Sequence, residues 1–164
     1  MMTRWLHLAP FMLFAMLTFA PGKANAACSA LSFCSCTASA TAVNFGNYDP
    51  TSASSNNSTG SIRVTCTLLL ALGGSYTIDL SPGSGSYALR TMKQGASSLS
   101  YNLYTDNARS QVWGNGTGGS VRVTNNFTAL LSVDQTTTVY ARVPAQQNVR
   151  AGLYSDTIVV TVTY

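Results

Sequence analysis

The last seven residues, Ile158-Val159-Val160-Thr161-Val162-Thr163-Tyr164, alternate strictly between two kinds of side chain. Ile158, Val160, Val162 and Tyr164 fall on one side of an extended chain, and the residues between them fall on the other. A period of two is typical of a β-strand that buries one face. Four earlier runs, at residues 62–66, 76–80, 99–104 and 139–143, show the same alternation and favour Val, Ile, Thr and Tyr.

Clusters of turn-forming residues separate these runs. They lie at residues 54–60, 81–85, 114–119 and 151–152. Short strands with regular turns predict an all-β, antiparallel sandwich or barrel in a single domain, with no helix. We interpret residues 51–59 as a solvated crossover loop. Residues 114–119 lack the Lys and the following helix of a phosphate-binding loop, so we predict a hairpin loop after Trp113.

The N-terminus predicts export. Arg4 precedes an apolar run from Leu8 to Ala20, and Ala24-Asn25-Ala26 matches a small-residue cleavage site. We therefore predict a signal peptide over residues 1–26 and a domain over residues 27–164, with no membrane insertion because no run reaches the roughly 20 apolar residues of a spanning helix. A lipid anchor on Cys28 is disfavoured because no large aliphatic residue precedes it.

The composition after residue 26 excludes several function classes. The single histidine, His7, lies in the predicted signal peptide, and the chain contains no Glu. Ser–His and Cys–His nucleophile pairs and His-ligated zinc are therefore unavailable, and we expect no enzyme, no cofactor and no metal site. The seven remaining Lys and Arg residues are scattered singly, so a nucleic-acid surface is not expected.

Four cysteines follow the predicted cleavage site, and an even number in an exported chain predicts disulfides. Cys66 falls on the inward face of its strand, so its partner should come from a neighbouring strand, either Cys34 or Cys36. We favour Cys36–Cys66, with Cys28–Cys34 closing a small N-terminal loop. A metal site built on Cys34-x-Cys36 and Cys66 is the alternative, and export argues against it.

Several stretches, taken in order, resemble one family. They are Cys36-Thr-Ala-Ser-Ala-Thr41, Asn44-Phe-Gly-Asn-Tyr-Asp-Pro50, Gly60-Ser-Ile-Arg-Val-Thr-Cys66, Arg90-Thr-Met92, Leu99-Ser-Tyr-Asn-Leu-Tyr-Thr105, Trp113-Gly114, Gly152-Leu-Tyr-Ser-Asp-Thr-Ile158 and Val160-Thr-Val-Thr-Tyr164. Together they look like a spore coat protein U domain, the pilin-like domain of archaic, Csu-type chaperone–usher pili.

The resemblance implies an immunoglobulin-like β-sandwich that lacks its last strand. In such a family a periplasmic chaperone first lends the missing strand, and at an outer-membrane usher the N-terminal extension of a sibling subunit replaces it. The expected acceptor groove lies along the final strand, at Ile158, Val160, Val162 and Tyr164. The expected location is the periplasm and then the cell surface, in an adhesive fibre of the kind that supports biofilms.

The N-terminus departs from the family pattern. Only residues 27–35 precede Cys36, where a strand-donating extension should lie. This predicts a subunit that accepts a strand without giving one, in a minor or tip-proximal position. The alternatives are a self-sufficient secreted coat protein and a carbohydrate-binding module that stacks sugars on Tyr104, Trp113 or Tyr140.

Overall fold

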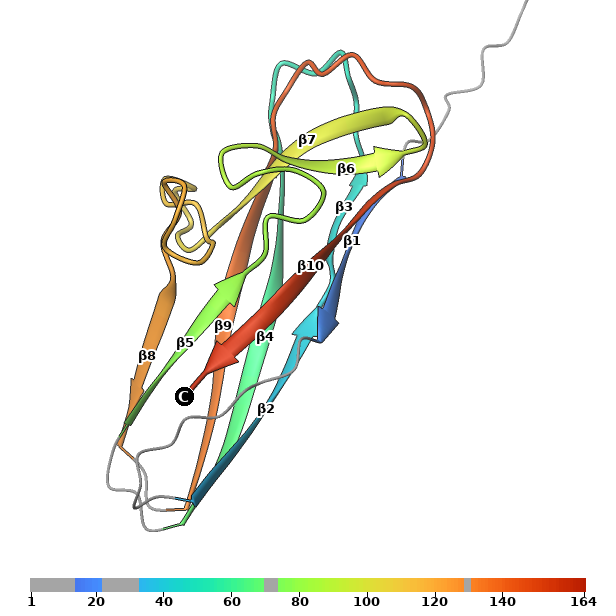
Figure 1. The fold of residues 1–164 in the computed structure, drawn as a ribbon. Helices are drawn as coiled ribbons and strands as arrows, with labels where there is room; N and C mark the ends of the chain where they lie inside the picture. Colours follow the sequence, from blue (N-terminus) through green and yellow to red (C-terminus); the bar gives the residue numbers. More distant parts are fainter. Residues whose placement is uncertain (1–13, 22–32, 70–73, 129–130) are drawn as a thin grey trace, which may run out of the picture.

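The computed structural model describes residues 14–21, 33–69, 74–128 and 131–164 (Figure 1). These ranges contain strands, turns and loops, and within them no helix is long and apolar enough to cross a membrane. The described strands are β1 (Phe14–Pro21), β2 (Phe33–Thr41), β3 (Val43–Asn47), β4 (Asn56–Leu69), β5 (Gly74–Leu80), β6 (Arg90–Gln94), β7 (Ser97–Tyr104), β8 (Val123–Phe127), β9 (Ser132–Val143) and β10 (Tyr154–Thr163).

The strands form two layers that share β7. One layer has the order β2-β4-β9-β7, and all of its pairs are antiparallel. The other continues from β7 through β6, β10 and β1 to β3, while β5 joins β10 and β8 extends β5. Figure 1 shows β4 and β9 behind β5 and β10, with β2 and β3 crossing from one layer to the other. The predicted all-β sandwich is confirmed.

The core lies between the inward faces of the two layers. Alternate residues of β4, β9, β5 and β10 are buried there because each strand exposes one face and covers the other. They include Ile62, Val64, Cys66, Val139, Ala141, Val143, Tyr76, Ile78, Leu80, Ile158, Val160 and Val162. The alternation read from the sequence at these runs therefore marks the buried face correctly.

A disulfide joins the N-terminal strand of the first layer to its neighbour. Cys36 of β2 lies directly opposite Cys66 of β4 in the antiparallel register, and the two form a disulfide across a sequence separation of 30 residues. The predicted Cys36–Cys66 pairing is thus confirmed. Cys28 lies outside the described residues, so the Cys28–Cys34 pairing stays a prediction.

Two features differ from the expectations. Residues 56–59 belong to β4 and pair with β9, so the predicted crossover loop ends before Asn56. The run assigned to a signal peptide contains a strand, β1, over residues 14–21. A short, mostly apolar run without charges suits both a signal peptide and a buried β-strand, so the sequence pattern does not separate the two.

The Cys36–Cys66 bond should contribute substantially to stability. Replacing both residues with Ala, in a full chain that already carries alanine at Cys28 and Cys34, should lower the free energy of unfolding by about 3–4 kcal/mol, the chain-entropy value for a loop of this length. Urea unfolding with and without a reductant measures it. The reductant should destabilise the parent and leave the double variant unchanged; an equal effect on both would contradict the assignment.

Candidate functional site

The edge of the final strand is the first element of the candidate site. On one side, β10 pairs with β6 at Ser155 and with β5 over Val160–Thr163. On the other side it pairs in parallel with β1 over its first seven residues, from Ala15 opposite Tyr154 to Pro21 opposite Val160. Figure 1 shows β1, in blue, running beside the dark red β10. β1 therefore supplies the hydrogen-bonding partner for this edge.

The second edge of the site belongs to β3. Its residues pair antiparallel with β1, from Asn47 opposite Phe14 to Val43 opposite Leu17, with a bulge between Ala15 and Met16. β1 thus lies between β3 and β10 and is bonded to both. A strand in that position is interior to the layer, and its removal would leave two unpaired edges facing one another.

The structure describes two neighbouring side chains of β1, Leu17 and Thr18, and they lie on opposite faces of the strand. Leu17 is fully buried in the core, opposite Asp156 and Val43. Thr18 is exposed, and its hydroxyl donates to the carbonyl oxygen of Asp156 at 3.3 Å. Burying one leucine side chain contributes roughly 1.5–3 kcal/mol. β1 is therefore held by backbone pairing and by the buried Leu17 side chain.

The structure places all four predicted groove residues along or just past β10. Ile158 and Val160 are buried opposite Phe19 and Pro21, so both lie alongside β1. Val162 is also buried, but it pairs with Ile78 of β5 beyond the end of β1. The half-buried Tyr164 lies further on, and its hydroxyl accepts a hydrogen bond from the backbone N–H of Cys36 at 3.1 Å.

Sequence reasoning missed the first half of this strand. Tyr154 and Asp156 lie on the same buried face as Ile158, two residues apart, and both pair with β1. Their spacing of two and four residues from Ile158, which places all three on one face of a strand, is the signal that could have identified them. The β3 edge was missed because Val43-Asn-Phe-Gly-Asn47 is only five residues long and contains Gly46 in a left-handed conformation.

The buried side chain of Asp156 anchors β10 within the core. Asp156 accepts hydrogen bonds from the backbone N–H and hydroxyl of Ser84 and from the hydroxyl of Tyr101, the last at 2.7 Å. Burial, with the charge of Asp156 in addition, raises the pKa of Tyr101, so its hydroxyl keeps the proton that it donates. These bonds tie β10 to β7 and to the loop over residues 81–89 at the position where Leu17 packs.

Arg90 stabilises the same loop from inside the core. Its guanidinium is fully buried and donates to the carbonyl oxygens of Ser81 and Trp113 and to Oδ1 of Asn102 at 2.7 Å. Burial lowers the pKa of Arg90, but an arginine remains charged at any ordinary pH. The five donors of the side chain suit this role, because several carbonyl groups that would otherwise be unpaired converge there.

The aromatic residues considered for sugar stacking do not form a free platform. Trp113 is fully buried, and its indole N–H donates to the carbonyl oxygen of Ile78 at 2.9 Å, so a role in stacking exposed sugars is wrong for this residue. Tyr104 and Tyr140 lie opposite one another on β7 and β9 and are half-buried. Arg142 covers the first ring and Arg109 the second, each with its guanidinium carbon within 6 Å of the ring centroid.

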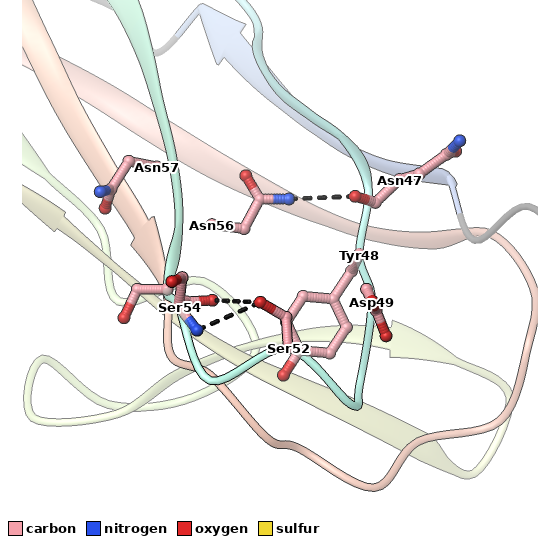
Figure 2. A pocket seen from close by; sticks show the side chains of 8 residues that line it. Asn47, Tyr48, Asp49, Ser52, Ser54, Asn56 and Asn57 are labelled. Atoms are coloured by element: carbon pink, nitrogen blue, oxygen red, sulfur yellow. Dashed lines mark hydrogen bonds between the residues drawn. The ribbon is translucent and has the colours of Figure 1, made fainter.

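A polar pocket of about 340 Å³ lies where β3 turns into β4 (Figure 2). The side-chain amide nitrogen of Asn56 donates to the backbone carbonyl oxygens of Phe45 and Asn47. The hydroxyl of Ser58 donates to the backbone carbonyl oxygen of Asn44. The pocket is lined by Asn47, Tyr48, Asp49, Ser52, Ser54, Ser55, Asn56 and Asn57. These bonds fasten the outer edge of β3 to β4, which leaves its other edge directed at β1.

Asp49 and Asp106 act locally. Hydrogen bonds from the hydroxyl and N–H of Thr51 lower the pKa of Asp49, and bonds from the N–H groups of Gln111 and Ser110 lower that of Asp106, as expected for carboxylates that close turns. Among the residues that the structure describes, no group of three His, Cys, Asp or Glu side chains could hold a metal ion.

Three comparisons bear on these observations. A family model described as the Spore Coat Protein U domain matches residues 23–161. Protein U of Myxococcus xanthus is 39% identical over 132 residues, which cover 74% of this chain and 71% of that protein. The fold resembles a chain in the crystal structure of the CsuC–CsuE chaperone–tip adhesion subunit pre-assembly complex of archaic chaperone–usher Csu pili from Acinetobacter baumannii. That match has a TM-score of 0.50 at 21% identity and covers 80% of this chain and 40% of the other.

The close approach of Gly83 to β10 gives a test of the anchor. Gly83 has a φ of +63°, and a Cβ there would overlap the carboxylate of Asp156; Gly95 has a φ of +55° with open space around it. Gly95→Ala should lower the free energy of unfolding by only roughly 1–2 kcal/mol, because alanine is disfavoured in a left-handed backbone conformation. Gly83→Ala should cost about 1–3 kcal/mol more, because Asp156 must move. Urea unfolding compares the two, and equal losses would contradict the proposed packing.

Proposed function

The chain belongs to the Spore Coat Protein U domain family, and from this membership we propose that it is an exported structural or adhesive subunit of a chaperone–usher pilus. It polymerises by accepting a β-strand from another chain between β10 and β3. The observation that carries the proposal is the position of β1: the strand that fills this site comes from the stretch that the sequence identifies as a signal peptide. Removal of residues 1–26 empties the site.

An empty site has the properties of a strand acceptor. The edge of β10 from Tyr154 to Val160 and the edge of β3 would both present unpaired backbone N–H and C=O groups. Unpaired groups in an apolar setting are costly, so a strand that satisfies both edges binds strongly. Ile158, Val160, Val162 and Tyr164 remain the groove residues of this proposal, joined by Tyr154 and Asp156 at its other end.

The proposed partners are those that the family resemblance implies. A periplasmic chaperone supplies the first strand, an outer-membrane usher directs the exchange, and a sibling subunit supplies the final strand. Phe33, the first residue of β2, already pairs with Leu69 of β4. After cleavage only residues 27–32 precede it, fewer than the eight residues of β1. The chain therefore accepts a strand and has none of comparable length to give, which supports a minor or tip-proximal position in the fibre.

A second candidate is a self-sufficient secreted coat protein. It is favoured by the closed sandwich of the full chain, in which both β10 and β3 are already paired with β1. If residues 14–21 stay attached, no partner strand is needed. The two functions therefore differ in whether the chain that leaves the cytoplasm folds alone.

Periplasmic co-expression tests the proposal. The chain that begins at Ala27 should be recovered only as a stoichiometric complex when the chaperone encoded beside it is present, and should be degraded without it. A photo-crosslinking residue at Thr157, on the exposed face of β10 opposite Thr18, should capture the chaperone. The matched control is Thr136, exposed on β9 in the other layer, which should not. A stable, cooperatively folding monomer would support the coat protein instead.

A further inference from the structure

We propose that residues 14–21 complement the sandwich within the same chain, so that the uncleaved polypeptide folds closed and becomes able to accept a partner strand only when this segment is lost. The inference rests on the proposed function, since it assumes that the groove between β3 and β10 is where assembly occurs. It adds an occupant for that groove, the chain's own β1, and a switch that removes it.

The first support is that β1 satisfies both edges at once. It pairs in parallel with β10 over seven residues and antiparallel with β3 over four. A segment that bound the domain only by hydrophobic contact would not need a regular hydrogen-bonded register with either β10 or β3. Pairing on both sides makes β1 equivalent to an interior strand, which is the position that a donor strand must occupy.

The second support is the placement of the described side chains. Leu17 enters the core beside Asp156 and is fully buried, while Thr18 stays outside and donates to the backbone of β10. The apolar run of a signal peptide need not alternate, because its work in the membrane has no inward and outward face. Leu17 and Thr18 nevertheless lie on opposite faces, the apolar residue inward and the polar one outward, as a strand in this groove requires.

The third support is the place of the predicted cut. β1 ends at Pro21 and β2 begins at Phe33, so cleavage after Ala26 falls in the connection between them and leaves every described strand whole. Before cleavage, β1 is attached to the domain, so it competes with strands from other chains for the groove at the high effective concentration of an intramolecular segment. After it, the same strand is a separate molecule that dilutes away, and a strand from another chain can take its place.

Matched substitutions in β1 test the inference. The full chain is produced without export, so that residues 1–26 remain. It is compared with the Leu17→Asn and Thr18→Asn variants of the full chain and with the chain 27–164. All four proteins are refolded with the Cys36–Cys66 bond formed. We expect the full chain and Thr18→Asn to be monomers with the same urea midpoint. Leu17→Asn should fall to the midpoint of 27–164, and its β3 and β10 amides should exchange hydrogen at least tenfold faster.

A peptide supplied in trans tests it without destabilising the chain. Residues 14–21, flanked by lysines for solubility, are added to 27–164 as it is diluted from denaturant. One peptide should bind per chain, seen by native mass spectrometry, and restore cooperative unfolding; the Leu17→Asn peptide should bind at least tenfold more weakly. Equal midpoints for the full chain, Leu17→Asn and 27–164, or no binding of the peptide, overturn the inference.

The outcomes separate this inference from the proposed function. If 27–164 forms the chaperone complex but the full chain is no more stable than 27–164, the groove is an acceptor and β1 is not its internal occupant. If 27–164 folds alone and matches the full chain, both proposals fall. If the full chain is closed by β1 and 27–164 requires the chaperone, both stand.

Discussion

The structure depends on the pairing of one edge of β10. This strand carries the alternating face of Tyr154, Asp156, Ile158, Val160 and Val162 into the core and exposes the residues between them. An unpaired edge would therefore leave a row of backbone N–H and C=O groups beside the core without strand partners. β5 and β6 satisfy parts of one edge, and β1 satisfies the other. Whatever provides that second partner decides whether the sandwich is closed, since β3 reaches the layer only through the same strand.

The polar groups beside β10 hold the strand in place independently of β1. Asp156 is bonded to Ser84 and Tyr101, and Arg90 holds the carbonyl groups of Ser81 and Trp113. None of these bonds involves β1. Buried polar networks of this kind specify one geometry when every member has its partner, because any displacement leaves a desolvated group unpaired. β10 is therefore positioned by its own layer and loops, and a strand accepted as we propose would meet an edge that is already formed.

The sequence predicted those elements whose alternation involves large apolar residues. The strands around Ile62, Ile78 and Leu103 followed from a period of two. The inward position of Cys66 limited its partner to Cys34 or Cys36, and the favoured pairing with Cys36 is the one that forms. The sequence did not predict β8, whose Val123-Thr-Asn-Asn-Phe127 is only half-buried at alternate positions. It also did not predict the complete burial of Arg90 and Trp113, because arginine is seldom fully buried and tryptophan, though mostly buried, rarely loses all of its exposure. β1 could not be recognised because a mostly apolar run, interrupted within it by Thr18, meets the requirements of an export signal as well as those of a buried strand.

The order of the elements makes exchange between internal and external strands physically simple. The segment that fills the groove precedes β2, and an N-terminal extension from a neighbouring chain would arrive from the same end of its own domain. The difference between the two is then one of connectivity, as in domain swapping, where an identical element is contributed in cis or in trans. Residues 22–32 can span up to roughly 36–40 Å, which makes the cis arrangement reachable. Residues 27–32 alone span about 20 Å, so a chain cut after Ala26 cannot refill its own groove with a strand as long as β1.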